Sequence, residues 1–166
     1  DLNLTWHFIG PIQSNKTKDI AQHFDWVHSV DRTKIAQRLS KQRPEDFPPM
    51  NVCIQVNIDN EESKSGINES AIIPLAEQID LLDNLTLRGL MIIPSKTDDI
   101  EQQRHSFHKA HALYQQLCAK YLSIDTLSMG MSNDMATAIS EGSTMVRIGS
   151  GIFGQRTTHL TPGQVN

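Results

Sequence analysis

The chain alternates short apolar runs with longer segments in which apolar residues recur at helical spacing. Short runs rich in β-branched residues that end at glycine, proline or polar residues are typical of buried strands. Such runs predict six strands, at residues 6–10, 25–30, 51–58, 85–94, 124–131 and 144–149.

The segments between these runs predict helices. In residues 68–83, for example, Ile72, Leu75 and Ile79 follow one another at three- and four-residue steps. A strand–helix repeat predicts an α/β fold with a parallel sheet and helices outside it. Two architectures fit this pattern, an open doubly wound sheet and a (β/α)-barrel. The predicted helices are 14–24, 32–43, 68–83, 98–121 and 134–141.

The stretch "RIGSGIFG" (147–154) contains a G-x-G-x-x-G pattern. In a dinucleotide-binding fold this pattern follows a strand, opens a helix and precedes an acidic residue by about 20 positions. A strand is predicted before it, but no helical period follows Gly154, and neither Asp nor Glu follows Glu141. The sequence therefore argues against a nicotinamide or flavin nucleotide site.

The barrel interpretation gives these glycines another use, because barrels often bind phosphate in the loops after strands 7 and 8. The loop 130–134 offers the Ser132 hydroxyl and the free amides at the start of a helix, which attract anions. The loop 147–151 offers Gly149, where backbone can approach closely, and Ser150. We expect the two loops to form one phosphate site. The alternative is that they are ordinary turns.

Arg147 strengthens the phosphate interpretation. It lies two residues before Gly149 on a predicted strand, so both face the barrel interior or its mouth. A buried arginine needs an anionic or acceptor partner, and the alternative partner is a strand carboxylate. If the last two strands are strands 7 and 8, residues 1–166 form one barrel domain that is N-terminally incomplete, with strands 3 to 8 only.

Several motifs together resemble the pyridoxal phosphate homeostasis protein family. They are "WHFIGPIQSNK", "FDWVHSVDR", "ESKSGI", "LRGLMIIP", "LSMGMSNDM" and "GSTMVRIGSGIFG", and the match covers about residues 4–156. The resemblance implies an alanine-racemase-like TIM-type barrel of fold type III that carries pyridoxal 5′-phosphate (PLP). It implies a function in PLP storage and delivery, without robust catalytic activity.

The resemblance also implies six cofactor-binding positions. Three would hold the phosphate, one would meet the pyridine nitrogen and two would line the pocket. In that order they are Ser132, Gly149 and Ser150, then Arg147, then Met91 and His7.

The family's Schiff-base lysine lies on strand 1, so it is expected upstream of Asp1, and no catalytic residue is expected in this chain. PLP chemistry depends on that lysine as the covalent anchor. The other candidates, Lys16, Lys18 and Lys64, lie in polar loops or helix starts. We expect them to be solvated, and this chain to hold no covalent PLP.

The composition limits the expected binding partners of the protein and its expected cellular location. The net charge is −4 with no basic stripe, which argues against nucleic acid. No apolar run approaches the roughly 18 residues of a membrane span, and no signal peptide is visible. Cys53 and Cys118 form no paired framework, so a cytoplasmic location is expected. The expected partners are PLP, PLP-dependent apo-enzymes, and a missing N-terminal segment or second chain that covers the open barrel edge.

Two other functions remain open, an amino-acid racemase and a fragment without function. An arginine at the ring nitrogen leaves the pyridine unprotonated and weakens it as an electron sink. A racemase also needs a second acid–base residue, and Tyr114 and Tyr121 lie on a predicted helix. No metal site is expected, because His105, His108 and His111 lie on a face of the predicted helix that we expect to be exposed to solvent.

Overall fold

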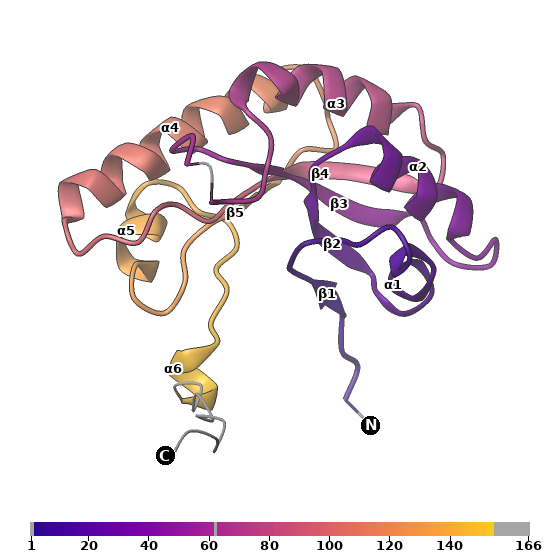
Figure 1. Cartoon of the computed structure of the whole chain (residues 1–166), viewed down its shortest axis with the longest axis horizontal. Coiled ribbons are helices and arrows are strands. Elements are labelled where there is room, and N and C mark those ends of the chain that lie inside the picture. The colour runs from indigo at the N-terminus through magenta and orange to yellow at the C-terminus, as the bar shows by residue number, and fades with distance from the viewer. Residues whose placement is uncertain (1, 62, 155–166) are drawn as a thin grey trace, which may run out of the picture.

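A computed structural model describes residues 2–61 and 63–154. Five parallel strands form one curved sheet in the order β1-β2-β3-β4-β5, which makes an open half-barrel (Figure 1). The predicted α/β class and partial barrel are therefore confirmed. The strands are β1 (His7–Phe8), β2 (Trp26–Val30), β3 (Met50–Val56), β4 (Leu85–Ile92) and β5 (Thr126–Ser128).

Helices connect the strands and cover the outer side of the sheet. Figure 1 shows α3 and α4 arching over one side of the sheet, with α6 on the opposite side. No helix in the described part of the chain is long and apolar enough to cross a membrane. The helices are α1 (Thr17–His23), α2 (Thr33–Gln42), α3 (Ile72–Asp80), α4 (Ile100–Cys118), α5 (Met135–Ser140) and α6 (Ser150–Phe153).

The two faces of the sheet carry different side chains. In β3, Val52, Ile54 and Val56 belong to the hydrophobic core beneath the helices. Cys53 and Gln55 alternate with them, so they lie on the other face, inside the half-barrel. This inner face carries most of the polar and titratable residues of the strands, and it leads to the candidate site.

Gly89 allows β4 and β5 to come close. Its φ is +149°, and a Cβ atom built on it would lie 1.8 Å from the Thr126 carbonyl oxygen. Only glycine fits this position without moving β5. The close pairing sets the register in which Met91 lies opposite Ser128.

Two predictions about the end of the chain are wrong. Residues 144–149 form no sixth strand, only a bridge between Met145 and Ser128, because β5 is three residues long and Gly130 turns away at a φ of +92°. A helix does open inside the glycine run, since α6 follows Gly149 directly. Residues 155–166, predicted to lack helical periodicity, lie outside the described residues.

Candidate cofactor site

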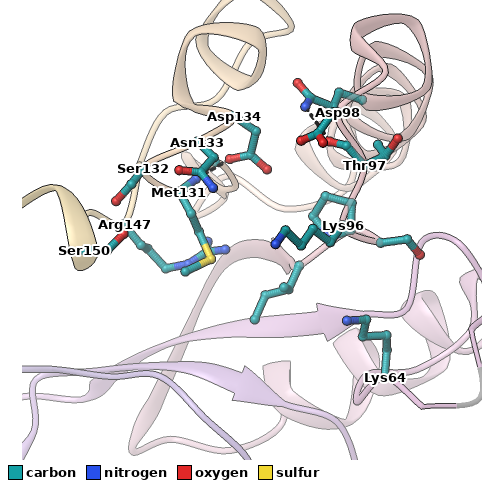
Figure 2. Close-up of a pocket in the computed structure, with 15 residues that line it drawn as sticks. Lys64, Lys96, Thr97, Asp98, Met131, Ser132, Asn133, Asp134, Arg147 and Ser150 are labelled. Carbon is teal, nitrogen blue, oxygen red and sulfur yellow. Dashed lines mark hydrogen bonds between the residues drawn. The ribbon is translucent and has the colours of Figure 1, made fainter. Parts of the chain in front are cut away.

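Two loops at the carboxyl ends of the strands line a cavity of about 290 Å³ (Figure 2). One loop connects β5 to α5 and contributes Ser132. The other leads into α6 and contributes Arg147 and Ser150. The structure thus brings together the two loops from which the sequence predicted a single site. Lys64 and Lys96 lie across the cavity from the two serines.

The groups around Ser132 suit the oxygens of a phosphate. The Gly151 amide donates to the Ser132 Oγ at 3.1 Å, so this glycine orients the hydroxyl. A Cβ atom on Gly151 would lie 3.3 Å from that oxygen, whereas one on Gly149 would meet nothing within 4 Å. Hydroxyls and amides of this kind are donors to anions. The open side of Gly149 leaves room for one.

Arg147 is fixed by two neutral acceptors. Its Nη1 donates to the Ser128 Oγ at 2.7 Å, and its Nη2 donates to the Ile92 carbonyl at 2.8 Å. The predicted alternative, a salt bridge to a strand carboxylate, is therefore not found among the described residues. Burial lowers the pKa of Arg147, while Asp134 nearby raises it. The guanidinium remains charged at neutral pH.

The six predicted positions lie around three cavities rather than one. Arg147 lines the first cavity and also a second one of about 550 Å³, which contains His7 and Gly149. Met91 is fully buried and lines a third cavity of about 270 Å³, together with Lys64. Ile93 lines all three cavities, so they adjoin one another.

A chain of polar side chains runs from Arg147 across the inner face. Ser128 Oγ is 2.9 Å from His28 Nδ1, and His28 Nε2 is 2.8 Å from His7 Nδ1. Burial, with the nearby His7 and Arg147, lowers the pKa of His28 to about 4. Burial also lowers the pKa of His7. His28 is therefore neutral at physiological pH.

Sequence reasoning missed Ser128 and His28, although a signal was present. Both are polar residues that follow an apolar residue within a predicted strand, His28 after Val27 and Ser128 after Leu127. A polar side chain at such a position points to the inner face and needs a partner there. The sequence alone does not say which partner it meets.

The lysines differ from expectation in one case. Lys16 and Lys18 are exposed, as expected. Lys64 is half-buried and lines two of the cavities, because the loop after β3 folds towards the site. Lys96 also faces the first cavity and was not predicted.

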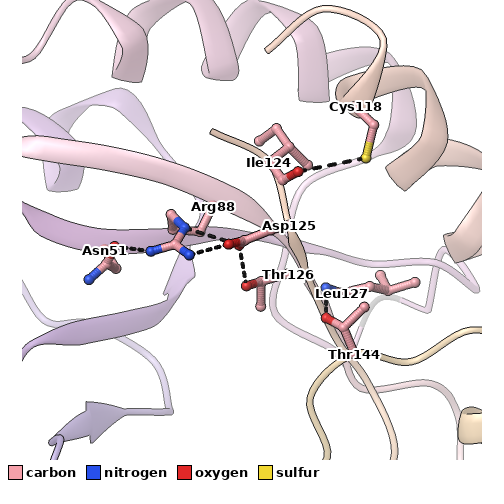
Figure 3. Close-up of polar contacts among 8 residues, drawn as sticks. All are labelled: Asn51, Arg88, Cys118, Ile124, Asp125, Thr126, Leu127 and Thr144. Atoms are coloured by element: carbon pink, nitrogen blue, oxygen red, sulfur yellow. Dashed lines mark hydrogen bonds and ion pairs between the residues drawn. The ribbon is translucent and has the colours of Figure 1, made fainter. Parts of the chain in front are cut away.

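A second polar cluster lies at the amino end of the strands (Figure 3). Arg88 forms an ion pair with Asp125, donates to the Asn51 side chain at 2.7 Å and lies 4.9 Å from the centre of the Trp26 ring. These contacts tie β2, β3, β4 and the start of β5 together. They lie far from the serine loops, so we assign them to stability.

The histidine stripe on α4 forms no metal centre in the described ranges, which contain no suitable group of three His, Cys, Asp or Glu. His108 is instead 3.4 Å from the Glu141 carboxylate. His111 stacks on Tyr114, which is buried in the core beneath the helices. The helix ends at Cys118, so Tyr121, predicted to be helical, lies beyond it.

Comparison with known proteins identifies the family. A model of the alanine racemase N-terminal domain matches residues 2–157. The pyridoxal phosphate homeostasis protein of Vibrio alginolyticus is 60% identical over 94% of this chain and 67% of its own length. The chain belongs to the pyridoxal phosphate homeostasis protein family. The family member from Escherichia coli K12 is 51% identical over 92% of this chain and 65% of its own length.

Solved structures agree with this assignment. PipY of Synechococcus elongatus, a structure with PLP bound, is 32% identical with a TM-score of 0.83, covering 92% of this chain and 72% of PipY. An alanine racemase of Clostridium difficile is 13% identical with a TM-score of 0.69, over 95% of this chain and 41% of the racemase, which shows the shared fold. The chain spans about two thirds of the curated homeostasis proteins it matches.

Proposed function

We propose that this chain holds PLP at the carboxyl ends of its strands and serves PLP homeostasis by storing and delivering the cofactor. The observation that carries the proposal is the position of Arg147, a half-buried cation between two loops that present the Ser132 and Ser150 hydroxyls. The PLP-bound structure of the relative PipY supports it.

The residues divide between the two ends of the cofactor. Ser132, Ser150 and the backbone at Gly149 would hold the phosphate, and the Arg147 guanidinium would donate to the ring nitrogen. His7 and Met91 would line the neighbouring space, His7 closer to Arg147 because it shares a cavity with it. When bound, PLP supplies a reactive aldehyde on an electron-poor ring. A donor at the ring nitrogen keeps that nitrogen unprotonated.

The covalent anchor is a separate proposal. We propose that none of Lys16, Lys18 and Lys64 anchors the cofactor, and that the anchor belongs to the first strand of the family's barrel. The exposure of Lys16 and Lys18 supports this proposal. Lys64 lies at the cavity wall, so it is the lysine that a test must address.

A binding function is favoured over racemase activity. Racemisation needs a second acid–base group at the bound substrate. Tyr114 belongs to the core beneath the helices, and burial raises its pKa to about 12. Incubation of the protein with PLP and L-amino acids, followed by optical rotation, tests this choice. Turnover at ordinary enzyme rates would overturn it.

We also propose that the chain belongs to a single (β/α)-barrel domain whose inner face is covered by further strands or by a second copy. The five strands share one sheet and one core, and the cavity beside His7 and Arg147 opens on the inner face. The relatives are longer than this chain, which supports strands from the same protein. Molecular mass in solution distinguishes the two sources.

The phosphate contact can be tested with two ligands that differ only in phosphate. The S132A/S150A double variant should bind PLP at least about tenfold more weakly, because it loses two hydroxyls next to a charged group. Pyridoxal, which has no phosphate, should bind both proteins equally. S123A changes an exposed serine in a distant turn and serves as the matched control. Equal PLP affinity in the double variant and the wild type would refute the proposal.

A further inference from the structure

We propose that Ser128 and His28 are positioning residues for Arg147, joined to it in a hydrogen-bond chain that donates in one direction from Arg147 through Ser128 and His28 to His7. The three distances along the chain are 2.7, 2.9 and 2.8 Å. The relevance to cofactor binding rests on the proposed function, whereas the direction of the chain follows from these contacts alone.

The direction is set by Arg147. A guanidinium only donates hydrogen bonds, so the Ser128 oxygen accepts from Arg147. The serine hydroxyl has one hydrogen, and the other contact found for it in the described structure is His28 Nδ1. Ser128 is fully buried, so an unpaired hydroxyl there would be costly. The hydroxyl therefore donates to His28, and Nδ1 is an acceptor.

The accepting role of Nδ1 fixes the tautomer of His28. A neutral imidazole carries one N–H, so with Nδ1 accepting, the hydrogen lies on Nε2. Nε2 is 2.8 Å from His7 Nδ1, which must then accept. A charged His28 would carry hydrogens on both nitrogens, and it would place a second positive charge one hydroxyl away from Arg147. The fully buried position of His28 disfavours that state further.

The hydrogen-bond chain also crosses the hollow of the half-barrel. His28 lies on β2 and Ser128 on β5, and both β3 and β4 separate these strands in the sheet. The hydrogen bond between them therefore spans the hollow of the half-barrel rather than following the sheet. Arg147 is held at the end of this bridge and by the Ile92 carbonyl of β4. Two fixed acceptors from different strands orient the guanidinium plane before any ligand binds.

The direct test is the protonation state of His28 in the ligand-free protein. Long-range proton–nitrogen NMR of ¹⁵N-labelled protein at neutral pH separates protonated from bare ring nitrogens. The inference predicts a bare Nδ1 and a protonated Nε2 for His28, with assignment by the signals lost in H28N. A protonated Nδ1, alone or in an imidazolium, would overturn it. This readout needs no PLP.

Variants then test the positioning role. S128A removes the link, so the His28 tautomers should mix and PLP affinity should fall about tenfold. H28F should weaken PLP binding similarly, while H28N, whose amide oxygen can accept from Ser128, should recover most of it. Rescue by H28N separates positioning from a loss of packing. If PLP binds the wild type and all three variants equally, the positioning role is wrong while the proposed function stands. If the wild type does not bind PLP, the proposed function fails, but the tautomer of His28 still tests the direction of the hydrogen-bond chain.

Discussion

His28 and Ser128 form a 2.9 Å hydrogen bond although they are 100 positions apart in the sequence and two strands of the sheet lie between them. The bond joins the two sides of the half-barrel and ends at Arg147. The Arg147 guanidinium is thus linked to side chains from two strands that do not pair with each other.

Stability should depend on pH through His28. Its pKa is about 4 in the folded protein and 6.5 in the unfolded chain, so the unfolded state binds more protons between these values. The free energy of unfolding should fall as pH drops from about 6.5 to about 4, by roughly 3 kcal/mol in total. Urea titrations at about pH 7, 5.5 and 4.5 measure this fall.

H28N is the control for this pH dependence, because it lacks the imidazole at position 28 but keeps His7, whose pKa is also lowered by burial. Three carboxylates have a lowered pKa, namely Asp59, Glu61 and Asp125, and they lose their contribution only below the ordinary carboxylate range, about pH 4. The two pH windows are therefore distinct. If the free energy of unfolding falls equally steeply in the wild type and in H28N between about pH 6.5 and 4, the pH dependence does not come from His28.

Substitutions at two glycines should affect the stability of the fold and the binding of PLP separately. G89A forces a Cβ against the Thr126 carbonyl in a strained backbone conformation, so we expect a loss of about 3 kcal/mol or more. G149A has an ordinary φ of −112° and free space around the added atom, so stability should change by less than about 0.5 kcal/mol. PLP binding should nevertheless weaken in G149A, because the methyl group occupies the proposed phosphate approach. Thermal denaturation and PLP titration of both variants check the two effects.

The Arg88 cluster should affect stability without affecting the cofactor. R88M removes the hydrogen bond to Asn51, the ion pair with Asp125 and the cation–π contact with Trp26. We expect a loss of about 2 kcal/mol in the free energy of unfolding, most of it from the half-buried contacts. PLP affinity measured under folding conditions should stay at the wild-type value. A matching loss of affinity would mean that the amino end of the barrel contributes to the site.

The lysine proposal can be checked by chemistry. Reduction with borohydride traps any imine between PLP and a lysine, and peptide mass mapping locates it. We predict no stoichiometric phosphopyridoxyl group on Lys16, Lys18 or Lys64. A stoichiometric adduct on Lys64 would contradict this prediction, and K64R would confirm the position. The exposed Lys18 reports the background of non-specific reaction.

The sequence predicted the parts of the molecule that depend on local periodicity. The strand containing His28 and the helices around the sheet follow from apolar spacing, and the meeting of the Ser132 and Ser150 loops follows from the shared edge of parallel strands. The failures arise where tertiary contacts decide. Residues 144–149 look like a strand, yet Gly130 ends the ladder beside them. The partner of Ser128 lies across the barrel, which no spacing reveals.

A crystal structure of the protein soaked with PLP tests the central claim most directly. We predict that the phosphate lies within hydrogen-bond distance of the Ser132 and Ser150 hydroxyls, and that the Arg147 guanidinium donates to the ring nitrogen while it stays bound to Ser128. A cofactor whose phosphate lies instead against Lys64 and Lys96 on the opposite wall, or whose ring does not touch Arg147, would contradict it.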